Sequence, residues 1–200
     1  MAASLTSTDL TLDNTSGASI PGTPSAGQTV IYPKDDKLLY YKNDAGQELP
    51  PGKVMQVVNF QTGAVATGTT VMPNDDTIPQ ITEGDQYMTL AITPTNASNI
   101  LQVNVTVFAA ASAANNIGVA LFEGVTANAL AAIYEPPNST DGGVGLSFMH
   151  RVVAGVTSAL TFRVRIGNGI AATVTFNGRV GGRIFGGVMA SSITITEYTA

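Results

Sequence analysis

Apolar and polar residues alternate through the middle of the chain. In the segment 100–108 (ILQVNVTVF) every second residue is apolar, and the segment 117–123 (IGVALFE) repeats the pattern. A period of two is typical of a β-strand with one face on a core and the other toward solvent or a neighbouring chain. The residues between the two segments are small and polar and can turn the chain. The two segments are therefore predicted to form an antiparallel pair, which further strands must cover, because one pair cannot bury its apolar face.

Similar β-rich or alternating runs fill most of the chain after residue 53, separated by turn residues. They lie at 54–60, 87–93, 100–108, 117–123, 129–135, 146–153, 160–166, 172–178 and 191–198. Many short strands without a helical period predict an all-β fold, an antiparallel β-sandwich of the jelly-roll kind. The alanines of 127–132 also favour a helical turn there. The long connection 63–84 is predicted to be functional or packed on a neighbour.

The N-terminal part has a different character. Residues 1–29 show no sustained period and are predicted to be an extended arm, either a disordered tail or an anchor that becomes ordered on a partner. The candidate anchor residues are the isolated apolar side chains Leu5, Leu10, Leu12 and Ile20.

A small hairpin is predicted between the arm and the main β region. The segment 29–52 has two short β-rich runs with turn residues beside them, and Pro50-Pro51-Gly52 ends it, because proline cannot donate to a strand ladder. The sequence thus predicts two parts, 1–52 and 53–200.

Composition narrows the possible partners. Of the 200 residues, 44% are hydrophobic but only 12% are charged, so Thr, Ser, Asn, Gly and Ala must form much of the surface. Such a surface suits contacts between subunits, where charges are depleted, and it also suits an ordinary neutral β domain. The net charge of −5 argues against a nucleic-acid partner. The sequence shows neither a secretory signal nor a membrane span, so no membrane partner is expected.

The charged residues are unevenly distributed. Candidate interface or ligand residues are the arginines Arg151, Arg163 and Arg165 and the acidic side chains Asp75, Asp76, Glu83 and Asp85. Arginines on the outer face of a sheet can bind carboxylates, phosphate or an acidic glycan, and pairing with the acidic loop is the favoured interpretation. Turn acids need no metal to explain them, so no metal is predicted.

Catalytic chemistry has few possible sources. His150 is the only histidine and there is no cysteine. His150 shares the parity of the apolar residues in its run, so it is expected on a strand face or interface and not as a catalytic base. The glycines match neither a phosphate loop nor a dinucleotide fingerprint. No catalytic residue and no cofactor are predicted.

Three segments of the chain together resemble a module found in virion proteins of tailed bacteriophages, often at the C-terminal end of tail-fibre-like or other particle-surface chains. They are TGTTVMPNDDTIPQITEGDQYMTLAITPTNASNILQV (67–103), VALFEGVTANALAA (119–132) and GGRIFGGVMASSITITEY (181–198). The segment VIYPKDDKLLYYKNDAGQE (30–48) separately resembles a short hairpin module near the start of phage fibre and decoration proteins. The resemblance implies a β-sandwich that assembles as a homotrimer on the virion surface.

The resulting hypothesis is a non-enzymatic structural protein, a capsid decoration or short head-fibre protein made in the bacterial cytoplasm. The 1–52 part would attach it to other virion proteins of the capsid or tail, and the 53–200 part would trimerise. One alternative is a tail-fibre or receptor-binding tip that reads host polysaccharide through loops such as 63–85 or 135–145. Another is a glycan-active enzyme, whose carboxylate pair would have to come from Asp75, Asp76, Glu83 or Glu135.

Overall fold

The structure of the chain is a computed structural model that describes residues 22–33, 39–46, 48–49, 54–137 and 139–199. By internal contacts the chain divides into two compact units, Met1–Lys53 and Val54–Ala200. The predicted anchor residues Leu5, Leu10, Leu12 and Ile20 lie outside the described residues. Their role, and the attachment role of the first part, therefore stay predictions.

The first unit contains a small antiparallel sheet of order β1-β2-β3. The strands are β1 (Thr29–Pro33), β2 (Leu39–Asn43) and β3 (Glu48–Leu49). Tyr32 is almost fully buried, and its ring lies 6.4 Å from that of Tyr40 on the paired strand. The backbone N–H of Gly27 donates to the carboxylate of Asp44, which ties the approach to β1 to the turn after β2. The predicted hairpin is confirmed, with a third short strand added to it.

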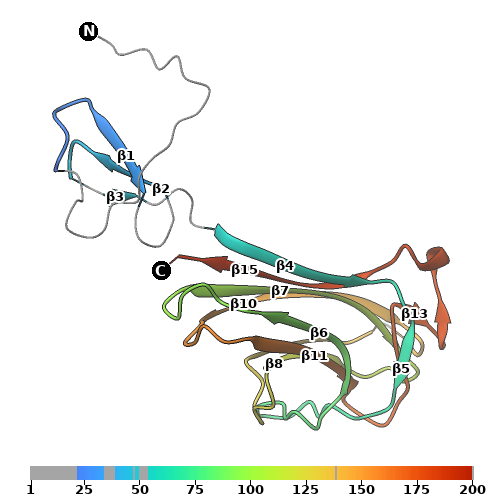
Figure 1. Ribbon diagram of the computed structural model, residues 1–200. Coiled ribbons are helices and arrows are strands. Elements are labelled where there is room, and N and C mark those ends of the chain that lie inside the picture. Colours follow the sequence, from blue (N-terminus) through green and yellow to red (C-terminus); the bar gives the residue numbers. More distant parts are fainter. Residues whose placement is uncertain (1–21, 34–38, 47, 50–53, 138, 200) are drawn as a thin grey trace. The chain divides into compact units, whose positions relative to one another are not determined.

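The second unit is an antiparallel β-sandwich, as the alternation predicts (Figure 1). One sheet has six strands, in the order β4-β15-β7-β12-β5 with β10 on the other edge of β7, and the opposite sheet has the order β6-β11-β8-β9. Its strands are β4 (Val54–Thr62), β5 (Ala66–Gly68), β6 (Asp85–Ile92), β7 (Ile100–Ala111), β8 (Ile117–Glu123), β9 (Ala131–Glu135), β10 (Gly143–Val153), β11 (Leu160–Asn168), β12 (Val174–Phe176) and β15 (Ser191–Tyr198). All nine predicted strands are present.

The order of the long strands is that of a jelly roll. In chain order the eight long strands are β4, β6, β7, β8, β9, β10, β11 and β15. The first, eighth, third and sixth of them are neighbours in one sheet (β4-β15-β7-β10). The second, seventh, fourth and fifth are neighbours in the other sheet (β6-β11-β8-β9). The chain therefore crosses from one sheet to the other at every connection between these strands except that between β8 and β9. Two sheets linked by such crossings make a double Greek key.

The predicted pairing of 100–108 with 117–123 is wrong. β7 pairs with β10 and β15 in the six-stranded sheet, whereas β8 pairs with β11 and β9 in the other. The two strands thus face each other across the core and bury their apolar faces together. The helical turn predicted near 127–132 is also absent, because the segment makes β contacts instead. Asn128 forms an isolated bridge with Gln80 of the 70–84 segment, and β9 starts at Ala131 and pairs with β8.

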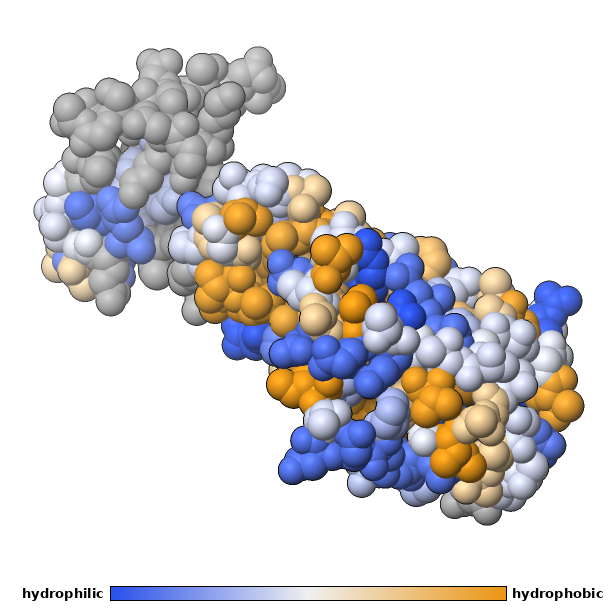
Figure 2. Space-filling model, turned by 90° about the horizontal axis from the view of Figure 1, so that it is seen from below, coloured by the Kyte–Doolittle hydropathy of each residue, from blue (hydrophilic) through white to orange (hydrophobic). Residues whose placement is uncertain are grey.

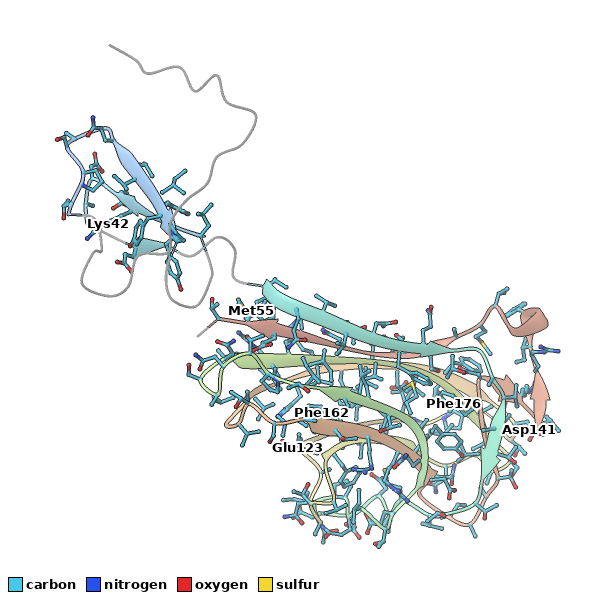
Figure 3. The ribbon with its side chains drawn as sticks, viewed as in Figure 1. Lys42, Met55, Glu123, Asp141, Phe162 and Phe176 are labelled. Carbon is cyan, nitrogen blue, oxygen red and sulfur yellow. The ribbon has the colours of Figure 1, made fainter. Side chains whose placement is uncertain are left out.

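The core lies between the two sheets. It is formed by the inward residues of both, and Phe162 from β11 and Phe176 from β12 lie inside it (Figure 3). The apolar positions of β7 that the alternation singles out, Leu101, Val103 and Val105, are fully buried. Burying this much apolar surface is the main source of the unit's stability.

The outer face of the four-stranded sheet is covered by the chain itself. The segment 70–84 runs across it, at the bottom of the view in Figure 1, and Met72 packs there with Ala120 and Phe122 in a second, smaller apolar cluster. The N–H of Met72 donates to the carbonyl of Asn168 on β11. The long connection is therefore a packed layer of the unit, and it also contains the unpredicted strand β5.

Replacing Gly167 with alanine is expected to loosen this layer. A Cβ at Gly167 would lie 2.7 Å from Met72 Cβ and 2.8 Å from Met72 N, closer than side chains normally approach. Overpacking of this kind costs about 1–3 kcal/mol in stability, measurable as a lower thermal midpoint. Gly145→Ala is the matched control, because a Cβ at Gly145 meets nothing within 4 Å. Equal midpoints for the two variants would contradict the close packing of Met72 on β11.

Candidate functional site

The four acidic candidates do not form one cluster of free carboxylates. Asp85 accepts hydrogen bonds from the N–H and hydroxyl of Thr70 at 2.9 and 2.7 Å, and Glu83 accepts one from the N–H of Gln80 at 2.9 Å. Asp75 accepts from the N–H and hydroxyl of Thr77. These three carboxylates hold turns of the 70–84 segment in place. Asp76 is exposed on the same segment.

The three candidate arginines lie on two different sheets. Arg163 and Arg165 lie on β11, opposite in parity to the buried Phe162 and Val164, whereas Arg151 lies on β10 in the other sheet. The alternation therefore gave the correct side of β11 but could not show that Arg151 belongs to a different sheet.

Within one chain, Arg163 and Arg165 donate to backbone oxygens, and their pairing with acidic side chains of an adjacent subunit stays a prediction. Arg165 Nε donates to the carbonyl of Glu83 at 2.9 Å, and its second nitrogen donates to the carbonyl of Gly84 at 2.7 Å. Arg163 donates to the carbonyl of Gly124. Both guanidinium groups thus bind backbone oxygens of crossing loops. Arg165 does contact the acidic segment, but through its main chain.

The outer face of the six-stranded sheet is nearly free of charge. The pairing registers place the outward residues of neighbouring strands in rows that run across this face from β4 through β15 and β7 to β10. The rows are Gln61–Ser192–Thr106–Ser147, Asn59–Thr194–Asn104–Met149 and Val57–Thr196–Gln102–Arg151. Among these residues Arg151 alone is charged, and its guanidinium lies 5.9 Å from the centre of the Tyr198 ring. This neutral surface resembles the cores of interfaces, where charges are depleted.

A projecting hairpin exposes bulky apolar side chains. It consists of β13 (Gly178–Arg179), β14 (Gly182–Arg183) and the short 3₁₀ turn η1 (Phe185–Gly187). Val180, Phe185 and Val188 are 72%, 75% and 85% exposed, and Val180 and Phe185 have φ of +51° and +49°. Positive φ is strained for such residues, and strain of this kind is concentrated at functional segments. Sequence reasoning missed this hairpin, since its two-residue strands are too short to show alternation.

Two adjoining hollows lie beside β9. The first, about 200 Å³, is formed by the 72–79 segment, by Asn116 just before β8, by Gly118 on β8, and by residues 132–134 of β9. The second, about 420 Å³, continues along 75–79 and 129–132. Figure 2 views the chain from below Figure 1, where the 70–84 segment lies, and hydrophobic patches (orange) alternate there with hydrophilic ones. Sequence reasoning singled out Asp75, Asp76 and the 63–85 loop but not the residues of β9 and 116–118, because distant segments meet to form these hollows.

The acidic side chains near the hollows were the candidates for metal or catalytic chemistry. Among the residues that the structure describes, no group of three or more His, Asp or Glu side chains is placed to hold a metal ion. The carboxylates lining the two hollows are Asp75 and Asp76, neighbours on one wall. Hydrogen bonds from Thr77 lower the pKa of Asp75, so this group is ionised at neutral pH and suits no general-acid role. No helix in the described part of the chain is long and apolar enough to cross a membrane.

The strand order defines the larger unit as a jelly roll, an architecture used by capsid and lectin domains and by cupins. No protein family matches the sequence, and no curated protein matches it. Among solved structures it is similar to Eiger TNF from S. frugiperda, at 10% identity over 70% of this chain and 92% of that chain, with a TM-score of 0.39.

Two viral structures are also similar. They are the infectious bursal disease virus Gt strain, at 11% identity over 81% of this chain and 44% of that chain (TM-score 0.32), and the VP2 subviral particle of the same virus, at 10% identity over 76% and 41% (TM-score 0.26). The chain thus spans less than half of these viral chains. At such TM-scores none of the three likenesses assigns a family or a function.

Proposed function

We propose that the chain is a non-enzymatic structural protein of a tailed-bacteriophage virion, a capsid decoration or short head-fibre protein that assembles as a homotrimer on the particle surface. Its mechanism is assembly: each copy closes its own core, and neutral outer surfaces then bind other copies. The protein is synthesised in the bacterial cytoplasm and then becomes part of the particle. Neither a cofactor nor a metal takes part in the assembly.

The observation that carries the proposal is the neutral outer face of the six-stranded sheet. A solvated sheet face can carry charged side chains without cost, yet Arg151 is the one charge in the three rows that cross this face. Removing Thr, Asn, Gln and Ser from water costs far less than removing charges. The face therefore suits contact with further copies of the same chain. The resemblance of residues 67–103, 119–132 and 181–198 to phage particle-surface modules supports the particle as the place of assembly.

The mass of the purified protein in solution tests the assembly. Light scattering coupled to size-exclusion chromatography is expected to give three times the chain mass of 20.5 kDa. A monomer across micromolar concentrations would overturn the trimer. Copy number on purified virions then separates placements, since hundreds of copies indicate decoration and a few dozen or fewer indicate a tail position.

A receptor-binding tip is the second candidate, and the hollows beside β9 favour it. A glycan-active enzyme would need two carboxylates on opposite sides of a groove. Asp75 and Asp76 share one wall, Glu83 accepts a hydrogen bond from its own loop, and Glu135 lines neither hollow. We therefore do not propose the enzyme.

Deletion of residues 1–21 tests the anchor. The deleted segment carries Leu5, Leu10, Leu12 and Ile20 and precedes the first described residue. The shortened protein is expected to remain a trimer and to lose binding to particles that lack the protein, measured by co-sedimentation. The full-length protein is the control. Normal loading of the shortened trimer would show that these residues are not the attachment device.

A further inference from the structure

The first hollow beside β9 gathers polar side chains that the fold itself does not use. Within the described residues, the amides of Asn74 and Asn116 and the hydroxyl of Tyr134 form no hydrogen bond with the protein, although all three residues line this hollow. Asn74 and Tyr134 are exposed and Asn116 is half-buried. These three polar groups around one concavity are therefore open to a ligand, and the case for one depends on what else lines the hollow.

Asp75 adds a fixed acceptor to the same hollow. Its Oδ1 accepts both bonds from Thr77, from the N–H at 2.9 Å and from the hydroxyl at 2.5 Å. These bonds hold the carboxylate in one orientation and leave Oδ2 without a bond to the described protein. The carboxylate is thus ionised, pre-oriented and available, which lowers the entropy lost on binding.

Tyr134 supplies an apolar surface. Its side chain is 57% exposed at the end of β9, and it lines the hollow opposite the 72–79 segment. The exposed face of a tyrosine ring can pack against the apolar part of a ligand, while its hydroxyl forms a hydrogen bond with a polar part. The hollow therefore combines a ring with a carboxylate and two amides.

This set of groups matches a sugar. A pyranose presents hydroxyls, which a carboxylate and amides can bind, and a face of C–H groups, which packs on an aromatic ring. The second hollow continues the first through Asp75, Thr77 and Pro79, and its volume of about 420 Å³ lies within the range of roughly 300–1,000 Å³ usual for small-molecule sites. A chain of sugars can thus extend from one hollow into the other.

Charge selects the kind of sugar. Asp75 and the exposed Asp76 line the second hollow, and no lysine or arginine lines either hollow among the described residues. An anionic sugar would meet negative charge without compensation. The site therefore suits neutral sugars.

We propose that the hollows beside β9 bind an uncharged polysaccharide, with Tyr134 as the stacking surface and Asp75, Asn74 and Asn116 as hydroxyl partners. The site gives the proposed particle-surface protein a means of adhering to a host cell envelope. A single copy can bind the sugar whether or not the protein belongs to a particle. Three linked sites would bind a polysaccharide more tightly than one site does, and this increase in avidity rests on the proposed trimer.

Binding to immobilised polysaccharides tests the site. Surface plasmon resonance with the full chain over a panel of neutral polysaccharides (mannan, galactan, dextran and rhamnan), with polyuronate as the acidic member, should show binding to at least one neutral member and none to polyuronate. Tyr134→Ala and Asn74→Ala should each weaken that binding at least tenfold. Ile170→Ala, an exposed apolar side chain that lines neither hollow, should leave it unchanged.

The outcomes separate this proposal from the proposed function. Absence of binding to every neutral member, equal binding by Tyr134→Ala, or stronger binding to polyuronate would each overturn the sugar site. If a trimer of three times 20.5 kDa is still found, the assembly proposal stands. A monomer that binds a neutral polysaccharide through Tyr134 would support the site and overturn the trimer.

Discussion

Glu197→Gln is expected to lower the stability of the larger unit by about 3 kcal/mol, the cost of disturbing several hydrogen bonds to a buried charged group. The side chain of Glu197 is fully buried near the end of β15. Its carboxylate accepts from Gln56 Nε2 and Asn99 Nδ2, both at 2.6 Å, and from the N–H and hydroxyl of Thr95, both at 2.8 Å. An amide would turn an NH₂ group toward these donors. In a unit of this size, the loss corresponds to roughly 6–12 °C in thermal midpoint.

The same carboxylate makes stability depend on pH. Burial raises the pKa of Glu197, but the hydrogen bonds from Asn99, Gln56 and Thr95 together outweigh burial, so the pKa falls below the ordinary value of 4.5. A carboxyl whose pKa is lower in the folded state contributes stability above its unfolded pKa and loses it as the pH falls through the folded one. The difference between wild type and Glu197→Gln should therefore be full at pH 7 and shrink below about pH 4.5.

Thermal unfolding at fixed protein concentration from pH 7 to pH 3 measures both effects. Glu135→Gln is the matched control, because Glu135 is exposed on β9 and its replacement should change the midpoint little. A midpoint of Glu197→Gln equal to that of wild type at pH 7 would contradict the structural role of the buried carboxylate. A difference that stays constant down to pH 3 would contradict the lowered pKa.

The face of each strand could be predicted from the sequence, but its partner could not. The alternation in 100–108 correctly gives the buried residues Leu101, Val103 and Val105. It does not say whether β8 returns beside β7 or crosses to the opposite sheet, since both arrangements bury the same side chains. The small and polar residues between the two strands permit either path. In a jelly roll nearly every connection crosses, so nearest-neighbour pairing is the wrong default.

The candidate site was harder to predict, for a related reason. Asp75 was singled out from its charge, and it does line the hollows beside β9. Tyr134 and Asn116 lie on other elements, and they meet Asp75 only because the 70–84 segment folds over the outer face of the four-stranded sheet. That fold-back depends on Gly118 and Gly167, which admit Met72 at close range. A one-dimensional pattern does not show such an approach.

Charge patterns were informative about sides but not about partners. Arg163 and Arg165 lie on the outer face of β11 as their parity indicates, yet they bind carbonyl oxygens and not carboxylates. A guanidinium group satisfies a loop carbonyl as readily as it pairs with an acid. The acids of this region, meanwhile, are used by nearby threonine and backbone donors.

Placing two glutamates on the neutral outer face is expected to abolish assembly. Thr106 on β7 is exposed and points outward, and Met149 on β10 is 54% exposed on the same face. Thr106→Glu combined with Met149→Glu would bring like charges from three copies into one contact. Desolvating each ion costs several kcal/mol, and each 1.4 kcal/mol is about tenfold in affinity. The dissociation constant should rise at least a hundredfold, so that light scattering at micromolar concentration gives a monomer.

The matched control carries the same two charges on the opposite sheet. Thr89 and Ala91 are exposed on β6, in the four-stranded sheet, so Thr89→Glu with Ala91→Glu should leave the trimer intact. Both double variants should keep a β-rich circular dichroism spectrum, because the four positions are on the surface. Trimers from the Thr106 and Met149 variant would exclude the six-stranded face as the contact. Loss of trimers from both variants would mean that added negative charge on either sheet prevents assembly. The contact could then not be assigned to the six-stranded face, because a specific interface should be sensitive to charge on one sheet only.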